Sequence, residues 1–150
     1  MLHPAILLVD DDEDYLEIAT RALVKEHLDA DVHVARTSTE ALRFLGLDGD
    51  SVAEAPPNLV AAFVDLNMPG IDGWEVLRRV RADDRLHGLP VVIISSSARS
   101  EDVRRSYDLG ANSYVVKRYE PSGPGRHLAR AVRYWLELNR VGPQVARRTV

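Results

Sequence analysis

The sequence predicts an α/β fold in which a doubly wound, five-stranded parallel sheet carries helices on both faces. Four continuous apolar runs, rich in valine and isoleucine, have the composition of strands buried on both sides: residues 5–9, 59–64, 91–94 and 114–116. A fifth run, residues 31–35, alternates polar and apolar side chains as a half-buried strand does. Segments with helical periodicity separate these runs, and such an alternating order requires right-handed crossovers.

Five helices are predicted between and after the strands. The first follows Asp12, a favourable N-cap residue, and its apolar positions between residues 15 and 23 repeat at helical spacing. Thr37 and Glu40 have the spacing of a capping box at the start of the second helix. The remaining helices are expected near residues 74–80, 100–109 and 125–139, with Gly110 ending the fourth helix and a long surface loop at 46–57.

Length and composition favour one domain spanning residues 1–150, with a core at about 5–140 and a C-terminal tail at 141–150. The chain of 150 residues is 45% hydrophobic, which is enough for a proper core. A net charge of −4 is too mild to indicate a nucleic-acid partner, and the lack of cysteine excludes disulfides and thiolate sites. The first apolar run is too short to cross a membrane, so we expect a cytoplasmic protein. The histidines show no metal-ligand spacing and are expected to be surface or packing residues.

Four of the predicted strands end in polar residues that suit phosphoryl-transfer chemistry. Asp10-Asp11-Asp12 follows the first strand, Asp65 the third, Ser95 the fourth and Lys117 the fifth. Ligands of open α/β sheets bind at the carboxyl ends of the strands, so these side chains should meet at one edge. Clustered carboxylates repel one another without a cation, and Mg²⁺ prefers carboxylate and water oxygens as ligands.

These residues and their order resemble the receiver domain of two-component response regulators over roughly residues 5–140. The resemblance is carried by Asp10-Asp11, by Asp65-Leu66-Asn67-Met68-Pro69-Gly70 with Asp72-Gly73, by Ser95, and by Gly110-Ala111-Asn112-Ser113-Tyr114-Val115-Val116-Lys117. It implies the flavodoxin-like strand order 2-1-3-4-5. It also implies a single-domain regulator that accepts a phosphoryl group from a histidine kinase, catalysing only its own phosphoryl transfer and dephosphorylation. Signalling would follow by protein contacts or by passing the phosphoryl group onward.

The resemblance gives roles to the site residues. Asp65 would be the phosphoacceptor, and Lys117 would pair with Asp65 and later with the phosphoryl group. The hydroxyl of Ser95 would turn toward the phosphoryl oxygen, and Tyr114 would swing inward with it as a conformational switch. For Tyr114 the alternative is a half-buried strand tyrosine whose hydroxyl lies in water.

The resemblance also implies a metal site for Mg²⁺ or Mn²⁺. Asp11 and Asp65 would bind the ion directly, while Asp10 would act mainly through water. The backbone carbonyl of Asn67 would complete the protein ligands. For the three consecutive aspartates the alternative reading is a solvated helix start.

Two features depart from the simplest members of that family. Arg118 stands where a proline with a cis peptide usually follows the lysine, and because a non-proline cis bond costs roughly 2.5–4 kcal/mol, a trans bond is expected. The long 46–57 loop and the aromatic stretch at residues 134–140 resemble stand-alone regulators encoded with bacterial phytochrome kinases. A phytochrome-type histidine kinase is therefore the expected partner.

Two other functions are open alternatives. A phosphohydrolase of the haloacid-dehalogenase type would also use an aspartate nucleophile, but it needs a second aspartate two positions later, where this chain has Asn67. The stronger alternative is a receiver-like interaction module that acts independently of phosphorylation, which the departure at Arg118 makes conceivable.

The last predicted helix carries more apolar surface than one internal contact needs. Its apolar arc spans about 220° at about 100° per residue, whereas a surface helix needs a stripe of only about 100° or somewhat more. Tyr134 and Leu138 lie on the excess part of the arc. We therefore expect a homodimer that pairs this helix and the neighbouring Tyr114 strand across a two-fold axis. The alternative is that the C-terminal tail covers the same surface.

Overall fold

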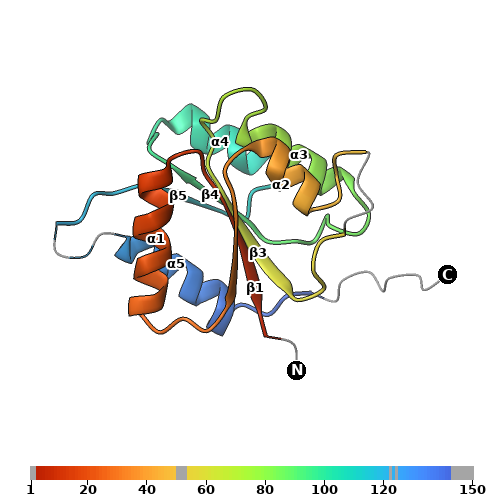
Figure 1. Ribbon diagram of the computed structural model, residues 1–150. Helices are drawn as coiled ribbons and strands as arrows, with labels where there is room; N and C mark the ends of the chain where they lie inside the picture. The colour runs from red at the N-terminus through yellow and green to blue at the C-terminus, as the bar shows by residue number, and fades with distance from the viewer. Residues whose placement is uncertain (1–2, 50–53, 122, 124, 143–150) are drawn as a thin grey trace.

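A computed structural model describes residues 3–49, 54–121, 123 and 125–142, and it has a parallel sheet with helices on both faces (Figure 1). The sheet order is β2-β1-β3-β4-β5, which confirms the predicted fold class and strand order. The strands are β1 (Ala5–Val9), β2 (Asp31–Ala35), β3 (Leu59–Val64), β4 (Val91–Ser95) and β5 (Ser113–Val116). The helices are α1 (Glu13–Lys25), α2 (Ser38–Phe44), α3 (Gly73–Ala82), α4 (Ser100–Asp108), α5 (Arg126–Arg133) and the π-helical segment η1 (Tyr134–Leu138).

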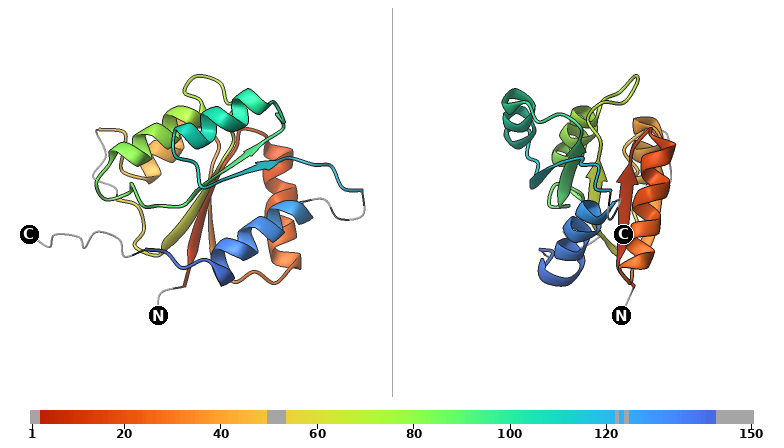
Figure 2. Two further views of the ribbon diagram at one scale, coloured as in Figure 1. Left: turned by 180° about the vertical axis from the view of Figure 1, so that it is seen from behind. Right: turned by 90° about the vertical axis from the view of Figure 1, so that its left-hand side faces the viewer.

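The hydrophobic core consists of two clusters, one on each face of the sheet. Helices α1 and α5 cover one face, and α2, α3 and α4 lie over the other (Figure 2). Along β1, Leu7 and Val9 belong to the α2–α3 cluster, while Ile6 and Leu8 belong to the α1–α5 cluster. Burial on both faces explains why the central strands are continuous apolar runs, whereas the edge strand β2 alternates.

The predicted helix starts are confirmed, with one change in the second. The Asp12 side chain caps α1 by accepting a hydrogen bond from the Tyr15 N–H at 3.1 Å. At α2, the Thr37 hydroxyl accepts from the Glu40 N–H at 3.0 Å. The Glu40 carboxylate accepts from the Arg36 N–H at 2.8 Å, one residue before the cap, because the extended chain brings that donor within reach.

The fourth helix ends as predicted at Gly110, which has a φ of +101°. The Gly110 N–H donates to the Tyr107 carbonyl and the Ala111 N–H donates to the Ser106 carbonyl, both at 3.0 Å. This pair of bonds is a Schellman motif, and its left-handed residue favours glycine.

The last helix covers the predicted residues but changes its winding. Regular α-helix ends at Arg133, and Tyr134–Leu138 form a π-helical turn. The angular spacing of 100° per residue, which was used to predict the apolar face, therefore does not apply beyond α5. A π-helix forms its backbone hydrogen bonds between residues i and i+5, one residue further apart than in an α-helix. Trp135 and Leu136 still pack on the α1–α5 cluster.

The predicted loop at 46–57 is only partly a surface loop. Leu47 packs against the α2–α3 cluster and Ala55 is buried in it, because an apolar side chain next to the core gains by burial. Residues 50–53 of this loop, residues 1–2, and residues 143–150 of the predicted tail lie outside the described residues. Within the described part of the chain, none of the helices has the length and apolar character required to cross a membrane.

Arg81 on α3 joins two loops at the amino-terminal side of the sheet. Its guanidinium donates to the carbonyls of Gly110, His87 and Leu89 and to the Asn112 side chain, at 2.6–3.0 Å. One side chain thus satisfies acceptors before both β4 and β5.

We expect Arg81→Met to lower the free energy of unfolding by about 2–4 kcal/mol, because the partly buried carbonyls of Gly110 and Leu89 lose their donor. The matched control is Arg78→Met, which removes a more exposed ion pair with Glu75 and should lower stability clearly less, because solvent screens such a pair. Urea unfolding of both variants measures the difference. Equal costs would show that the Arg81 hydrogen bonds contribute little.

Candidate functional site

The carboxyl ends of β1, β3, β4 and β5 bring the four predicted polar residues to one edge of the sheet. Asp10 follows β1, Asp65 follows β3, Ser95 ends β4 and Lys117 follows β5. Backbone bonds fix this alignment: the Asp65 N–H donates to the Val9 carbonyl at 2.9 Å, and the Lys117 N–H donates to the Ser95 carbonyl at 2.7 Å. Parallel pairing therefore places these chemically distinct side chains together.

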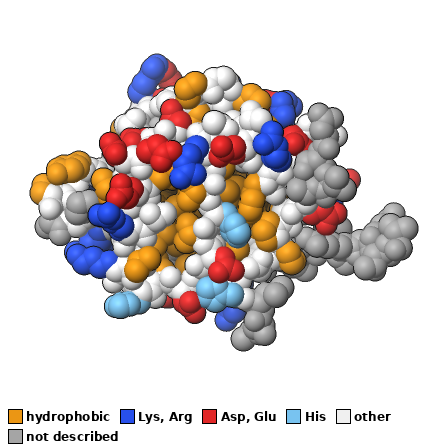
Figure 3. All heavy atoms as spheres, in the orientation of Figure 1, with side chains coloured by type: hydrophobic (Ala, Val, Ile, Leu, Met, Phe, Trp, Pro, Cys, Tyr) orange, Lys and Arg blue, Asp and Glu red, His pale blue; other side chains and the backbone are white. Residues whose placement is uncertain are grey.

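Three carboxylates form the centre of the site. Oxygen atoms from Asp10, Asp11 and Asp65 lie within 4.8 Å of one another. Asp10 and Asp65 are buried, whereas Asp11 is exposed. Further acidic side chains gather at this end of the molecule, where α1 begins (Figure 3). Clustered carboxylate oxygens are the ligand set that Mg²⁺ and Mn²⁺ prefer, so the residues present fit a divalent cation.

One ammonium group faces these carboxylates. Lys117 Nζ lies 2.6 Å from Asp10 Oδ2 and 3.7 Å from Asp65 Oδ1, so the expected pairing with Asp65 exists but the Asp10 contact is the shorter. Burial raises the pKa of Asp65 to about 6, and the Asp10 charge adds to this while Lys117 opposes it. Burial also raises the pKa of Asp10, against its hydrogen bond to Lys117. Three carboxylates thus face one ammonium, and a divalent cation would neutralise the excess negative charge.

Ser95 and Tyr114 are connected through Ser97, a residue with no predicted role. The buried Ser95 hydroxyl accepts from the Ser97 N–H at 3.1 Å. Tyr114 is a half-buried residue of β5, as in the alternative, and its hydroxyl donates to the Ser97 carbonyl at 2.8 Å. Its role as a conformational switch stays a prediction. The Ser97 hydroxyl in turn donates to Asp102 of α4 at 2.5 Å. The loop after β4 is thereby tied to both β5 and α4.

Helix α4 is attached to the rest of the protein mainly by polar contacts. Ser106 is its buried residue, and the hydroxyl of Ser106 accepts from Trp74 Nε1 on α3 at 3.0 Å. The Arg105 guanidinium lies 4.1 Å from the centre of the Trp74 ring. Figure 2 places α4 at the outer side of its helical layer.

Gly73 brings the start of α3 against the backbone of Asp65. A Cβ atom at Gly73 would lie 2.1 Å from the Asp65 carbonyl oxygen. The Gly73 N–H also donates to the Leu66 carbonyl at 3.2 Å, and the Asp72 side chain caps the helix. Only a residue without a side chain fits here. The Asp72-Gly73 motif contains this glycine, but the sequence alone does not show which contact requires it.

The remaining predictions concern Asn67 and Arg118. The Asn67 backbone N–H forms a hydrogen bond with the Asp65 carboxylate, which works against the raised pKa of that group. Coordination of a metal by the Asn67 carbonyl stays a prediction. The Lys117–Arg118 peptide is trans, as predicted.

Two aromatic residues near the site, Tyr15 on α1 and His127 on α5, were not predicted to belong to it. The Lys117 ammonium lies 4.4 Å from the centre of the Tyr15 ring. The Tyr15 hydroxyl lies 3.5 Å from His127 Nε2. The helical spacing of Tyr15 indicated only a core-facing position, and nothing in a single sequence pairs it with a residue so far along the chain.

Comparison with known proteins identifies the family. The family model described as the response regulator receiver domain matches residues 6–123, and the chain belongs to this family. Response regulator Rcp1 of Synechocystis is 30% identical over 132 residues, which cover 88% of each protein. The crystal structure of the phosphorylated cyanobacterial phytochrome response regulator RcpA is 30% identical with a TM-score of 0.81, covering 93% of this chain and 99% of that one.

Two further structures bear on the site. The bacteriophytochrome response regulator RtBRR is 36% identical with a TM-score of 0.73, covering 95% of this chain and 86% of its own. The Mn²⁺-bound form of Rcp1 is 27% identical with a TM-score of 0.79, covering 93% and 99%. Receiver domains of this family act in two-component signalling and bind divalent metal ions.

Proposed function

We propose that this chain is a single-domain response regulator that accepts a phosphoryl group on Asp65 from the phosphohistidine of a histidine kinase. The observation that carries the proposal is the setting of the Asp65 carboxylate. It is buried at the end of β3, clustered with Asp10 and Asp11, and 3.7 Å from the Lys117 ammonium. That arrangement places a carboxylate nucleophile beside one ammonium and in a cluster of carboxylates suited to a divalent cation, and phosphoryl transfer to a carboxylate requires such charge neutralisation.

The transfer would be a direct displacement at phosphorus. A carboxylate oxygen of Asp65 forms the new O–P bond as the N–P bond of the phosphohistidine breaks, and the imidazole nitrogen keeps the electron pair and takes up a proton. Charge is spread over the phosphoryl oxygens during this step. The Lys117 ammonium would stabilise that charge, and the Ser95 hydroxyl would donate to a phosphoryl oxygen after leaving the Ser97 N–H.

Asp10, Asp11, Asp65 and the carbonyl of Asn67 would hold Mg²⁺ or Mn²⁺, with Asp10 acting mainly through water. When bound, the ion would neutralise phosphoryl oxygens and hold them in place. Support comes from the excess negative charge of the three carboxylates over Lys117.

A phytochrome-type histidine kinase is the proposed partner. Its support is the similarity to RcpA, a phytochrome response regulator, and to RtBRR, a bacteriophytochrome response regulator. In this proposal the chain catalyses only its own phosphoryl transfer and dephosphorylation. A single domain over residues 1–150 and a cytoplasmic location stay predictions.

The proposal is tested by incubating the purified chain with acetyl phosphate, with and without Mg²⁺, and mapping the labelled residue by peptide mass spectrometry. We expect a base-labile label on Asp65 that EDTA prevents, because an acyl phosphate hydrolyses readily and the acidic cluster needs a cation. A label that maps to a serine or a histidine instead of Asp65 would contradict the proposal. A chain that takes up no label would favour the alternative of an interaction module independent of phosphorylation.

A homodimer through the last helix is a further part of the proposal. Tyr134 is 48% exposed and Leu138 is 72% exposed, and η1 places both beside the half-buried residues that contact the core. We expect Tyr134→Asp with Leu138→Asp to convert a dimer into a monomer without changing phosphorylation of Asp65, since charges are costly in an apolar interface. Sedimentation velocity measures the change.

The control for the dimer test is Val24→Asp, which alters an exposed apolar residue of α1 and should leave the dimer intact. A wild-type chain that sediments as a monomer at high micromolar concentration would rule out this interface.

A further inference from the structure

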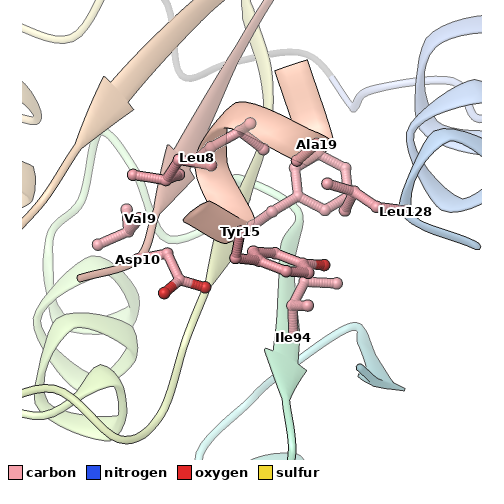
Figure 4. A pocket seen from close by; sticks show the side chains of 9 residues that line it. Leu8, Val9, Asp10, Tyr15, Ala19, Ile94 and Leu128 are labelled. Atoms are coloured by element: carbon pink, nitrogen blue, oxygen red, sulfur yellow. The ribbon is translucent and has the colours of Figure 1, made fainter. Parts of the chain in front are cut away.

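Tyr15 lies between the phosphoryl-transfer site and helix α5. It belongs to the first turn of α1, where its N–H donates to the Asp12 cap. Figure 4 shows the Tyr15 ring beside Ile94 of β4, with its hydroxyl directed away from Asp10. The ring thus occupies the side of the acidic cluster that faces α5.

The face of the Tyr15 ring contacts the one cation of the site. Lys117 Nζ lies 4.4 Å from the ring centre and 2.6 Å from Asp10. An ammonium over an aromatic face is attracted by the electron density of the ring. Unlike another carboxylate, the ring adds no formal charge to a site that already holds three carboxylates. Tyr15 therefore attracts Lys117 without competing with a phosphoryl group for positive charge.

His127 holds the other end of the ring. The Tyr15 hydroxyl and His127 Nε2 are 3.5 Å apart, and the two ring centres are 6.4 Å apart. Burial lowers the pKa of His127, which favours the neutral imidazole that can accept from a phenol. His127 Nδ1 is buried and has no hydrogen-bond partner among the described residues, so in this part of the chain the Tyr15 hydroxyl is the polar contact of the imidazole.

The Tyr15 ring packs against the α1–α5 cluster and borders a small cavity. The cavity has a volume of about 10 Å³ and lies beside Leu8, Ala19, Ile94 and Leu128 (Figure 4). That volume is at the lower limit for one water molecule. The contacts with Lys117 and His127 add to this packing in orienting the ring.

We infer that Tyr15 is a positioning residue: the face of its ring keeps the Lys117 ammonium beside Asp10 and Asp65. His127 in turn holds the Tyr15 hydroxyl. The inference rests on the proposed function, in which Lys117 contacts the phosphoryl group. It makes α5 a support of the reacting site through the contact between Tyr15 and His127. The residue acts through Lys117 and does not itself contact the phosphoryl group.

The contact between the Lys117 ammonium and the Tyr15 ring can be measured without any phosphorylation. The chain has two lysines, Lys25 and Lys117, so a sample labelled with ¹³C-lysine gives two side-chain signals, with the exposed Lys25 as internal reference. The ring current of Tyr15 should move the Lys117 ε-proton signal to lower chemical shift. Tyr15→Leu should abolish this displacement and Tyr15→Phe should retain it. An undisplaced Lys117 signal in the wild type would overturn the inference.

The functional consequence is measured by the rate of labelling with acetyl phosphate and Mg²⁺. We expect Tyr15→Leu to lower the rate by about threefold to thirtyfold, as loss of a cation–π contact allows. Tyr15→Phe should keep most of the rate, because it retains the ring face and loses only the hydroxyl contact with His127. Tyr119→Leu is the control, since Tyr119 belongs to the same loop as Lys117 and is 83% exposed.

The outcomes separate this inference from the proposed function. A wild type that takes up no label would contradict the proposed function, while the lysine spectra would still test the ring contact. A labelled wild type with an unchanged rate in Tyr15→Leu would overturn the inference alone. So would a Tyr15→Phe variant as slow as Tyr15→Leu. Thermal unfolding of each variant ensures that folded proteins are compared.

Discussion

Replacement of Asp65 by asparagine is expected to abolish labelling by acetyl phosphate and, at the same time, to stabilise the metal-free protein. An amide of the same shape cannot form the acyl phosphate, so no residual label should appear at this position. The gain in stability follows from burial: the Asp65 carboxylate lies among Asp10 and Asp11 with one ammonium nearby. Removing a charge from such a cluster relieves repulsion.

The sign of the pH dependence follows from the raised pKa of Asp65, about 6 against an ordinary 3.8. Between these values the folded chain binds more protons than the unfolded chain, so wild-type stability falls as the pH rises through this range. Asp65→Asn lacks this group. The free energy of unfolding of Asp65→Asn should exceed that of the wild type by about 1–3 kcal/mol at pH 7. This difference should disappear below about pH 4. Urea unfolding at several pH values in EDTA measures it.

Mg²⁺ should reverse this order of stability. A ligand that binds only the folded state adds to its stability, so Mg²⁺ should raise the melting temperature of the wild type more than that of Asp65→Asn. Asp11→Asn is the matched control, since it removes an exposed carboxylate from the proposed metal ligands and leaves Asp65 in place. It should weaken labelling without abolishing it. An Asp65→Asn variant that is less stable than the wild type in EDTA would contradict the charge argument.

Replacement of Gly73 by alanine is expected to cost the most stability of any small change near the site. The added methyl group would lie 2.1 Å from the Asp65 carbonyl oxygen, and no side-chain rotation can relieve a contact with backbone. The start of α3 or the turn after β3 must move. Overpacking of this kind costs about 3 kcal/mol or more, the upper end of the usual range.

The same movement should lower the labelling rate of Asp65 by about tenfold to a hundredfold, because a shift of about 1 Å in a reacting group has that effect. Gly88→Ala is the control: a Cβ at Gly88 meets nothing within 4 Å, so stability and labelling should stay near wild-type values. If Gly73→Ala also behaves like the wild type, α3 is not what sets the position of Asp65.

The sequence was sufficient to predict which residues meet at the edge of the sheet. Parallel strands end on the same side, so a polar residue directly after each apolar run had to approach the others, as Asp10, Asp65 and Lys117 do. The cap at Asp12 and the end at Gly110 were predictable because both depend on residues within one or two helical turns.

Contacts between side chains from distant segments were not predictable. Lys117 lies closer to Asp10 than to Asp65 because of the path of one side chain, which strand order does not determine. Tyr15 and His127 are 112 residues apart in the sequence, and they meet only because α1 and α5 cover the same face. The π-helical turn after Arg133 likewise has no signal in hydrophobic periodicity, since a few residues cannot distinguish the two windings.

The attachment of α4 has a consequence for how signalling could proceed. A helix held by apolar burial cannot leave its place without exposing core surface to water, and α3, with Val76, Leu77 and Val80 buried, is such a helix. Helix α4 is held by Ser106, Trp74 and the Ser97–Asp102 bond, and water can replace hydrogen bonds at little net free energy. Local opening of α4 therefore costs less than opening of α3. A small rearrangement of the loop after β4 can therefore displace α4 while the sheet that holds Asp65 stays intact.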